Sequence, residues 1–128
     1  MAKNWMAWGA ILAMAAVALG AFGAHGLKEA LSPERLEIFH TGVRYQFYHA
    51  FALLFLGLWA KSSPENRMIP KAGVAFMIGI VLFSGSLYVL SIRDLLSWPV
   101  GWLGPVTPLG GVAFIIGWVL VLVGVNRD

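Results

Sequence analysis

Three stretches of this 128-residue chain contain no Asp, Glu, Lys or Arg and are long enough to cross a lipid bilayer. They are residues 5–24, 72–92 and 108–125. The hydrocarbon core of a bilayer is about 30 Å thick and takes about 20 helical residues. Only 12% of the residues are charged, against about 25% in a typical soluble domain. The three stretches therefore predict transmembrane helices.

A fourth span is predicted over residues 43–60, which are apolar apart from a polar first half. That half contains Arg44, Tyr45, Gln46, Tyr48 and His49. Polar side chains at membrane depth need partners inside the protein. The helical pattern extends back to Pro33, so we expect residues 33–42 to form an interfacial segment before this second span. The predicted fold is an all-α integral membrane four-helix bundle, with residues 1–128 forming one transmembrane domain.

Turn residues mark the ends of these helices. Ser32, Ser63 and Thr107 each precede a proline, a pair that favours the start of a helix. Pro70 can open the third span in the same way. Residues 61–71 predict a polar loop, and residues 93–107 predict a Trp- and Pro-rich connection along the membrane surface before the fourth helix. The tryptophans expected to anchor span ends are Trp5, Trp8, Trp59, Trp98 and Trp102.

The basic residues divide between the two ends of this four-span arrangement. One end, which also carries both termini, has Lys3, Lys61, Arg67, Lys71 and Arg127, and the other has Lys28, Arg35, Arg44 and Arg93. Basic residues are in excess on the cytoplasmic side of membrane proteins, so we expect both termini in the cytoplasm. No Lys/Arg cluster is dense enough to indicate nucleic-acid binding. The first apolar stretch is longer than the core of a cleaved signal, so we expect it to be retained.

Polar residues with versatile chemistry gather between Gly20 and His49. Tyr45 and His49 share one helix face, and His25 lies near the same depth if the first two spans form a hairpin. We expect them to form a polar cluster with Gln46 and with residues of the third span, namely Ser84, Ser86 and Tyr88. His40 and Arg44 lie on a different face and are expected at the interface, with Arg44 either reaching the surface or pairing with Glu37.

Several chemical roles are open to this cluster. The simplest is a hydrogen-bonded network that holds the helices in register. A second is a proton or small-ligand site, since imidazoles titrate near neutral pH. Haem ligation by two histidines, a metal site using His40 with a carboxylate, and a serine hydrolase using Asp94 have no supporting spacing. We therefore predict no catalytic residue, cofactor or metal site.

Small residues recur at positions where two helices can approach closely. The chain has 15 glycines, and small residues four positions apart are typical of helix contacts in membranes. The glycines assigned to helix packing are Gly20, Gly23, Gly85, Gly110 and Gly111.

Four segments, one from each predicted helix region, carry a family resemblance. They are "ALGAFGAHGLK" (residues 18–28), "FHTGVRYQFYHAFALL" (39–54), "LFSGSLYVL" (82–90) and "VTPLGGVAFIIGW" (106–118). In order and spacing the chain resembles the small bacterial inner-membrane proteins of a domain-of-unknown-function family that includes transmembrane protein 256. The resemblance implies a four-helix membrane protein and brings no catalytic role. It implies characteristic positions at His25, Tyr45, His49, Ser84, Gly85, Ser86, Tyr88, Pro108, Gly110 and Gly111.

Two functional hypotheses follow from these observations. The first is a non-enzymatic assembly or accessory component that acts in the lipid bilayer as a homo-oligomer or within a larger membrane complex. The second is binding or transport of a proton, small solute or lipid at the His/Tyr cluster of an oligomer.

Overall fold

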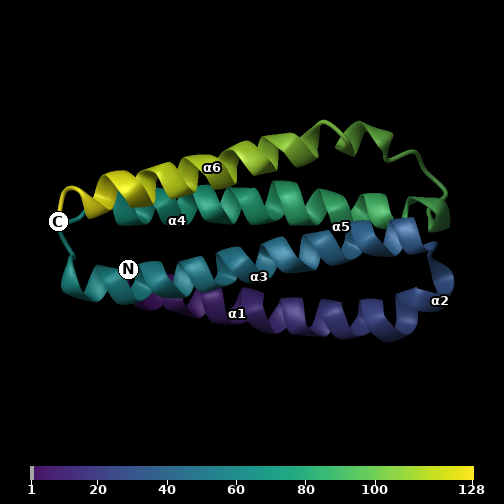
Figure 1. Ribbon diagram of the computed structural model, residues 1–128, viewed down its shortest axis with the longest axis horizontal. Helices are drawn as coiled ribbons and strands as arrows, with labels where there is room; N and C mark the ends of the chain where they lie inside the picture. The colour runs from purple at the N-terminus through teal and green to yellow at the C-terminus, as the bar shows by residue number, and fades with distance from the viewer. Residues whose placement is uncertain (1) are drawn as a thin grey trace.

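The computed structural model describes residues 2–128, which form four long helical rods running up, down, up and down (Figure 1). The first rod is α1 (Ala2–Phe22), the π-helical turn η1 (Gly23–Leu27) and α2 (Lys28–Ala30), and the second is α3 (Pro33–Ser62). The third is α4 (Met68–Gly79), the π-helical turn η2 (Ile80–Ser84) and α5 (Gly85–Ser91), and the fourth is α6 (Val106–Val125). The described residues contain no strand. The predicted all-α fold with four helices is confirmed.

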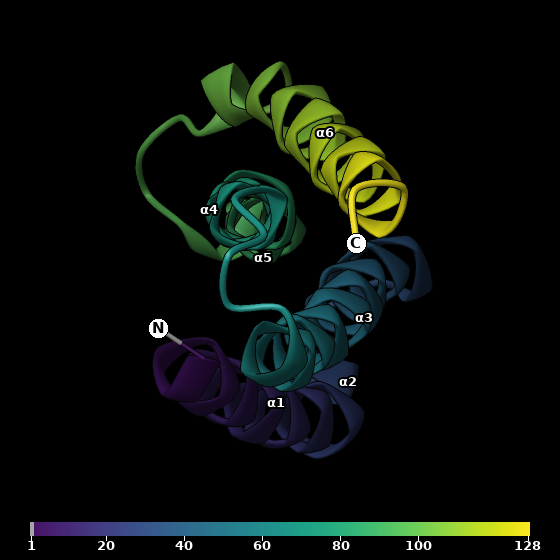
Figure 2. The same cartoon turned by 90° about the vertical axis from the view of Figure 1, so that its left-hand side faces the viewer.

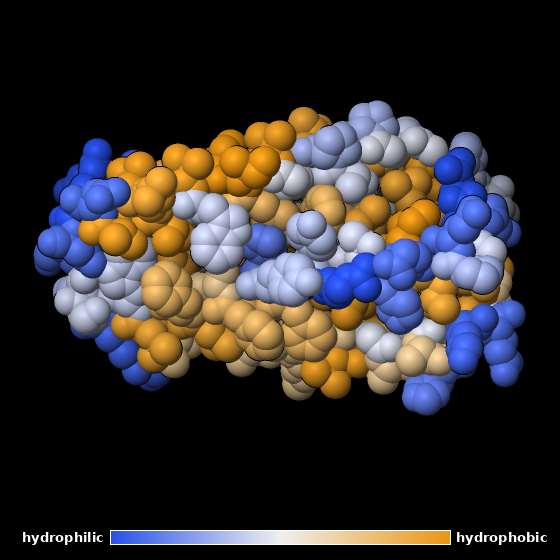
Figure 3. All heavy atoms as spheres, in the orientation of Figure 1, coloured by the Kyte–Doolittle hydropathy of each residue, from blue (hydrophilic) through white to orange (hydrophobic). Residues whose placement is uncertain are grey.

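Three of the rods are long and apolar enough to cross a membrane. They are Ala2–Ala30, Met68–Ser91 and the stretch Gly101–Val125 that contains α6. The α3 helix is outside this set, but it packs along the whole length of α1 (Figures 1 and 2). Its 30 residues span about 45 Å at 1.5 Å per residue, so α3 is long enough to cross the same layer. In Figure 3 hydrophilic residues gather at both ends and hydrophobic residues cover most of the waist.

Close contacts between α1 and α3 define which part of α3 lies in the apolar layer. A Cβ on Gly23 would lie 2.8 Å from the Phe39 ring, and one on Gly57 would lie 2.8 Å from the Ala2 carbonyl. The apolar part of α1 therefore faces residues 39–57 of α3. Arg44 lies five residues inside this boundary, at a depth of roughly 7 Å.

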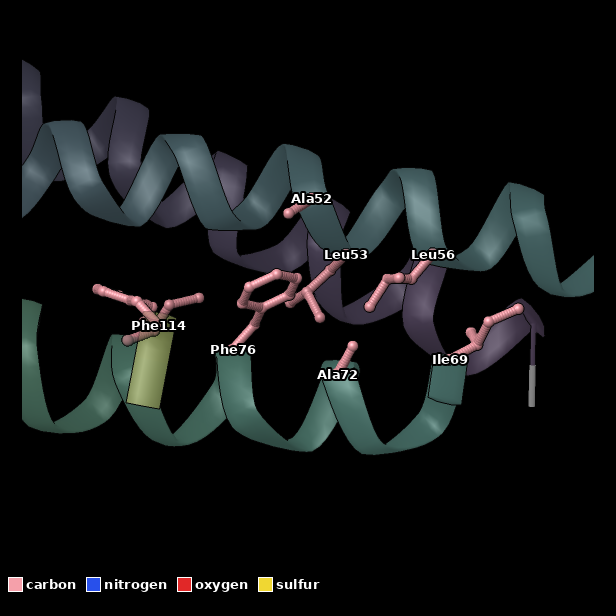
Figure 4. Packing of buried hydrophobic residues seen from close by; sticks show 8 residues of the cluster. Ala52, Leu53, Leu56, Ile69, Ala72, Phe76 and Phe114 are labelled. Carbon is pink, nitrogen blue, oxygen red and sulfur yellow. The ribbon is translucent and has the colours of Figure 1, made fainter. Parts of the chain in front are cut away.

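The main apolar core lies where α3, α4 and α6 meet (Figure 4). Leu53 and Leu56 of α3 pack with Phe76 of α4 and Phe114 of α6, and all four are almost fully buried. A second cluster under the opposite end includes Ala16, Phe39 and Val43. The two clusters make one continuous bundle, in which α3 contacts every other rod.

Several predicted helix starts differ from the structure. Ser32 does cap α3, because its Oγ accepts a hydrogen bond from Arg35 N at 3.3 Å. Ser63 and Pro64, however, lie in the loop, and α4 begins at Met68, whose N–H donates to Asn66 Oδ1 at 3.1 Å. The α6 helix begins at Val106, so Thr107 lies inside its first turn.

The long connection before α6 contains two short 3₁₀ turns, η3 (Arg93–Leu95) and η4 (Gly101–Leu103). Trp98 and Trp102 are 63% and 69% exposed. Their exposure at the end of the bundle fits the anchoring role expected for them.

Candidate functional site: a polar network between the helices

Gln46 links three helices near the middle of the membrane. Its Nε2 donates to the Leu12 carbonyl of α1 at 2.8 Å, and its Oε1 accepts from the Tyr88 hydroxyl of α5 at 2.6 Å. Gln46 itself is only 4% exposed. A buried amide is costly unless both of its ends are paired, and here each end has a partner on a different helix.

Two serines of the third rod extend the network to its neighbours. Ser84, which is fully buried, donates to the Gly42 carbonyl of α3 at 2.7 Å. The Ser86 hydroxyl lies 2.6 Å from Thr107 Oγ1 of α6 and donates to the Phe83 carbonyl at 2.9 Å. These bonds tie the third rod to α3 on one side and to α6 on the other.

His49 joins α3 to α6, and its partners define its tautomer. Trp118 Nε1 lies 3.1 Å from His49 Nε2, and an indole N–H can only donate, so Nε2 is the acceptor. The proton is therefore on Nδ1, which donates to the Tyr45 carbonyl at 2.8 Å. The imidazole ring also stacks on Phe114, with ring centroids 3.6 Å apart and planes 9° apart. Both nitrogens of a neutral imidazole are thus occupied.

The structure does not bring His25 into this cluster, contrary to expectation. His25 is exposed at the end of α1, and no hydrogen bond links its side chain to another residue in the described part of the chain. It lies in the π-helical turn η1, where Gly23 and Leu27 take the buried positions. A residue midway between two buried positions on a helix points the opposite way, which places His25 outside.

Tyr45 also differs from the interior position expected for it. Its side chain is 38% exposed and packs over Phe83 with ring centroids 4.6 Å apart. Its contribution to the network is the backbone carbonyl that accepts from His49.

The interfacial residues of α3 form a separate group. Arg44 Nη2 bonds Glu37 Oε1 at 2.6 Å and Thr41 Oγ1 at 3.1 Å, so the pairing with Glu37 is present. His40 is half-buried beside Gly23 and Phe39. One turn nearer the membrane surface, Arg35 pairs with Asp94 at 3.1 Å, which ties α3 to the long connection.

The predicted packing glycines have different surroundings. A Cβ on Gly110 would lie 2.7 Å from the Phe83 Cα, and one on Gly23 would meet the Phe39 ring. Gly20 and Gly111 have only ordinary contacts, at 3.6 Å to Val43 and 3.9 Å to Phe83. Gly85 has no neighbouring atom within 4 Å of its Cβ position, so the packing role assigned to it is not supported.

Sequence reasoning missed several participants in the network. Thr107 was expected only to cap a helix and Trp118 was not included in the expected polar cluster, whereas both are hydrogen-bond partners. Gly42 was not singled out, although its carbonyl accepts from Ser84. One signal for Trp118 was available, because it is the tryptophan that lies away from the predicted span ends.

The helical bundle and its internal network define a small polytopic membrane protein. Residues 19–111 match the family model described as "Protein of unknown function (DUF423)". The chain is 46% identical over 121 residues to UPF0382 membrane protein YwdK of Bacillus subtilis, covering 94% of each chain. It is 41% identical over 111 residues to UPF0382 inner membrane protein YgdD of Escherichia coli, covering 87% of this chain and 80% of the relative. No solved structure gives a significant match.

The chain therefore belongs to the DUF423/UPF0382 family of membrane proteins of unknown function, and the family suggested by its sequence motifs is confirmed.

Proposed function

We propose that this protein is a non-enzymatic component of the bacterial inner membrane that acts by assembling with a second copy of itself. The observation that carries the proposal is that the polar groups of the two most central buried side chains, Gln46 and His49, all have partners within the protein. Gln46 has a partner at each end of its amide, and His49 has one at each ring nitrogen. A catalytic or transport site needs a group that is free to change partners, so this interior favours a structural role.

The outer face of α3 supports association. Arg44, Tyr45 and Tyr48 are all exposed at membrane depth, Tyr48 by 54%. Polar side chains interrupt the hydrophobic waist on the face shown in Figure 3. Polar groups that face lipid are costly, and a protein neighbour would lower this cost.

A second copy suits this face because it is self-complementary. Copies in one membrane share an orientation, so residues at equal depth meet across a two-fold axis. Arg44 and Tyr48 differ in depth by one helical turn, about 6 Å, and the long Arg44 side chain can reach over this offset. The guanidinium of each copy can therefore lie over the Tyr48 ring of the other as a cation–π pair.

Photo-crosslinking tests this arrangement at natural expression level in the protein's own membrane. Benzoylphenylalanine replaces Tyr48, and the matched control places it at Val119, a 51% exposed residue on α6. The expected result is a covalent species of twice 13.9 kDa from the Tyr48 position and none from Val119. If neither crosslinker position gives a covalent dimer, the dimer is ruled out. If Tyr48 crosslinks to a different protein, that protein and not a second copy covers this face.

The orientation proposed for this protein places both termini in the cytoplasm. The end that carries the termini also carries Lys3, Lys61, Arg67, Lys71 and Arg127, one more basic residue than the opposite end. A C-terminal green fluorescent protein should be fluorescent, and a C-terminal alkaline phosphatase should be inactive. The reverse pattern would invert the topology.

A further inference from the structure

A hollow of about 700 Å³ lies where the C-terminus meets the α3–α4 loop, at the left-hand end of the bundle in Figure 1. Its lining includes three cations, Arg67, Lys71 and Arg127, and two carboxylates, Glu65 and Asp128. The side chains of the lining thus have a net charge of +1. No ion pair in the described chain involves any of these three cations.

One wall of the hollow already binds a carboxylate. Asp128 accepts hydrogen bonds from Asn66 Nδ2 at 2.8 Å, from Ser63 Oγ at 2.9 Å and from the Trp59 indole. These bonds, that of Asn66 foremost, lower the pKa of Asp128 below its ordinary value. The donors therefore stabilise negatively charged oxygen at this wall and leave the three cations without a carboxylate of their own.

The hollow lies at the level of the lipid headgroups. Lys71 directly precedes the charge-free stretch of residues 72–92, so it marks the boundary between the apolar layer and water. The α4 helix begins at Met68, which also lines the hollow, and the positive end of its dipole adds to the field of the cations.

We propose that this hollow binds the phosphodiester headgroup of an anionic membrane phospholipid. Basic pockets between transmembrane helices on the cytoplasmic side are suited to such headgroups. Arg67 and Arg127 offer planar donors for two phosphate oxygens, and Lys71 supplies a further cation at the acyl-chain side. This site is independent of the α3 face proposed for dimerisation, because the hollow lies at the C-terminal end of α3 whereas that face lies near the middle of the helix.

Lipid titration of the purified protein in neutral detergent tests the site. The probe is dioctanoyl phosphatidylglycerol, followed by native mass spectrometry, with dioctanoyl phosphatidylcholine and inorganic phosphate as parallel probes. The variant is Arg67→Gln with Lys71→Gln, and the matched control Lys61→Gln removes a charge at the same end but outside the lining. All three positions are exposed, so the fold should be retained, which circular dichroism checks.

The expected result is tighter binding of phosphatidylglycerol than of phosphatidylcholine. The double variant should weaken binding by about 25-fold, at about fivefold per cation, and Lys61→Gln should leave it unchanged. Equal weakening by Lys61→Gln would show diffuse attraction in place of a site and overturn the proposal. Inorganic phosphate that binds as tightly as phosphatidylglycerol would overturn the lipid assignment.

Discussion

Replacing Gly110 by alanine should destabilise the bundle, because the new methyl group would meet backbone rather than a movable side chain. Its Cβ would lie 2.7 Å from the Phe83 Cα and also against the Phe83 nitrogen. The α6 helix and the third rod would have to separate at this point. Overpacking of this kind costs about 1–3 kcal/mol, and the better helix propensity of alanine returns up to about 1 kcal/mol. With the full gain in helix propensity, the net loss of unfolding free energy is about 0–2 kcal/mol.

Gly85→Ala is the matched control for this substitution. It makes the same chemical change in the same pair of neighbouring rods, but no atom lies within 4 Å of its Cβ position. Helix propensity acts alike in both variants and cancels in their difference. The difference between the two variants thus isolates the overpacking cost of about 1–3 kcal/mol.

Reversible unfolding by sodium dodecyl sulfate in mixed micelles, followed by circular dichroism, would give both free energies. We expect Gly85→Ala to be neutral or slightly stabilising and Gly110→Ala to unfold at a lower mole fraction of denaturant. Equal unfolding free energies would refute the close approach of α6 to Phe83, and with it the packing of the fourth helix.

Two further predictions concern the polar network and the loop end. Tyr88→Phe and Gln46→Leu each remove the same interhelical hydrogen bond. A double-mutant cycle should therefore give a coupling free energy of about 0.6 to 1.7 kcal/mol between them. Strictly additive effects would contradict that bond. Asp128 has a lowered pKa in the folded protein, so its stabilising effect is present above its ordinary pKa of 3.8 and is lost as the pH falls through the lower folded value. The melting temperature of the wild type should therefore exceed that of Asp128→Asn at pH 6 and approach it below pH 4, whereas a constant difference would show that the charge is not responsible.

Much of the fold follows from local sequence, because a membrane helix is defined by a run of about 20 apolar residues. The three charge-free stretches and the cap at Ser32 depend only on their own residues and neighbours. The start of α4 was placed too late because Pro70 attracted the prediction, whereas the structure uses the Asn66 side chain to begin the helix at Met68. Sequence alone does not single out Asn66 as the cap, because Ser63 before Pro64 and Pro70 also indicate helix starts in the same loop.

Part of the membership of the polar network was predictable, but its pairing was not. Gln46, Ser84, Ser86 and Tyr88 are polar residues inside apolar spans, and such residues need partners. Their actual partners depend on the register of one helix along another. Close contacts at glycines such as Gly57 set this register. His25 failed for a different reason, since only its depth was used to place it in the cluster, and at that depth its side chain points away from the buried positions of Gly23 and Leu27.

Gly42 connects packing to the network and gives the sharpest test of it. A Cβ at this position would lie 2.7 Å from the Tyr88 Cε1 and 3.3 Å from the Ser84 carbonyl oxygen, so the absence of a side chain lets the Tyr88 ring cross α3 to reach Gln46. Gly42→Ala should push the ring away and break that bond. Tyr88→Phe should then cost almost nothing in the Gly42→Ala background, although it costs about 1 kcal/mol in the wild type. If Tyr88→Phe is equally costly in both backgrounds, the ring reaches Gln46 without the space at Gly42, and the glycine serves only the approach of the two helices.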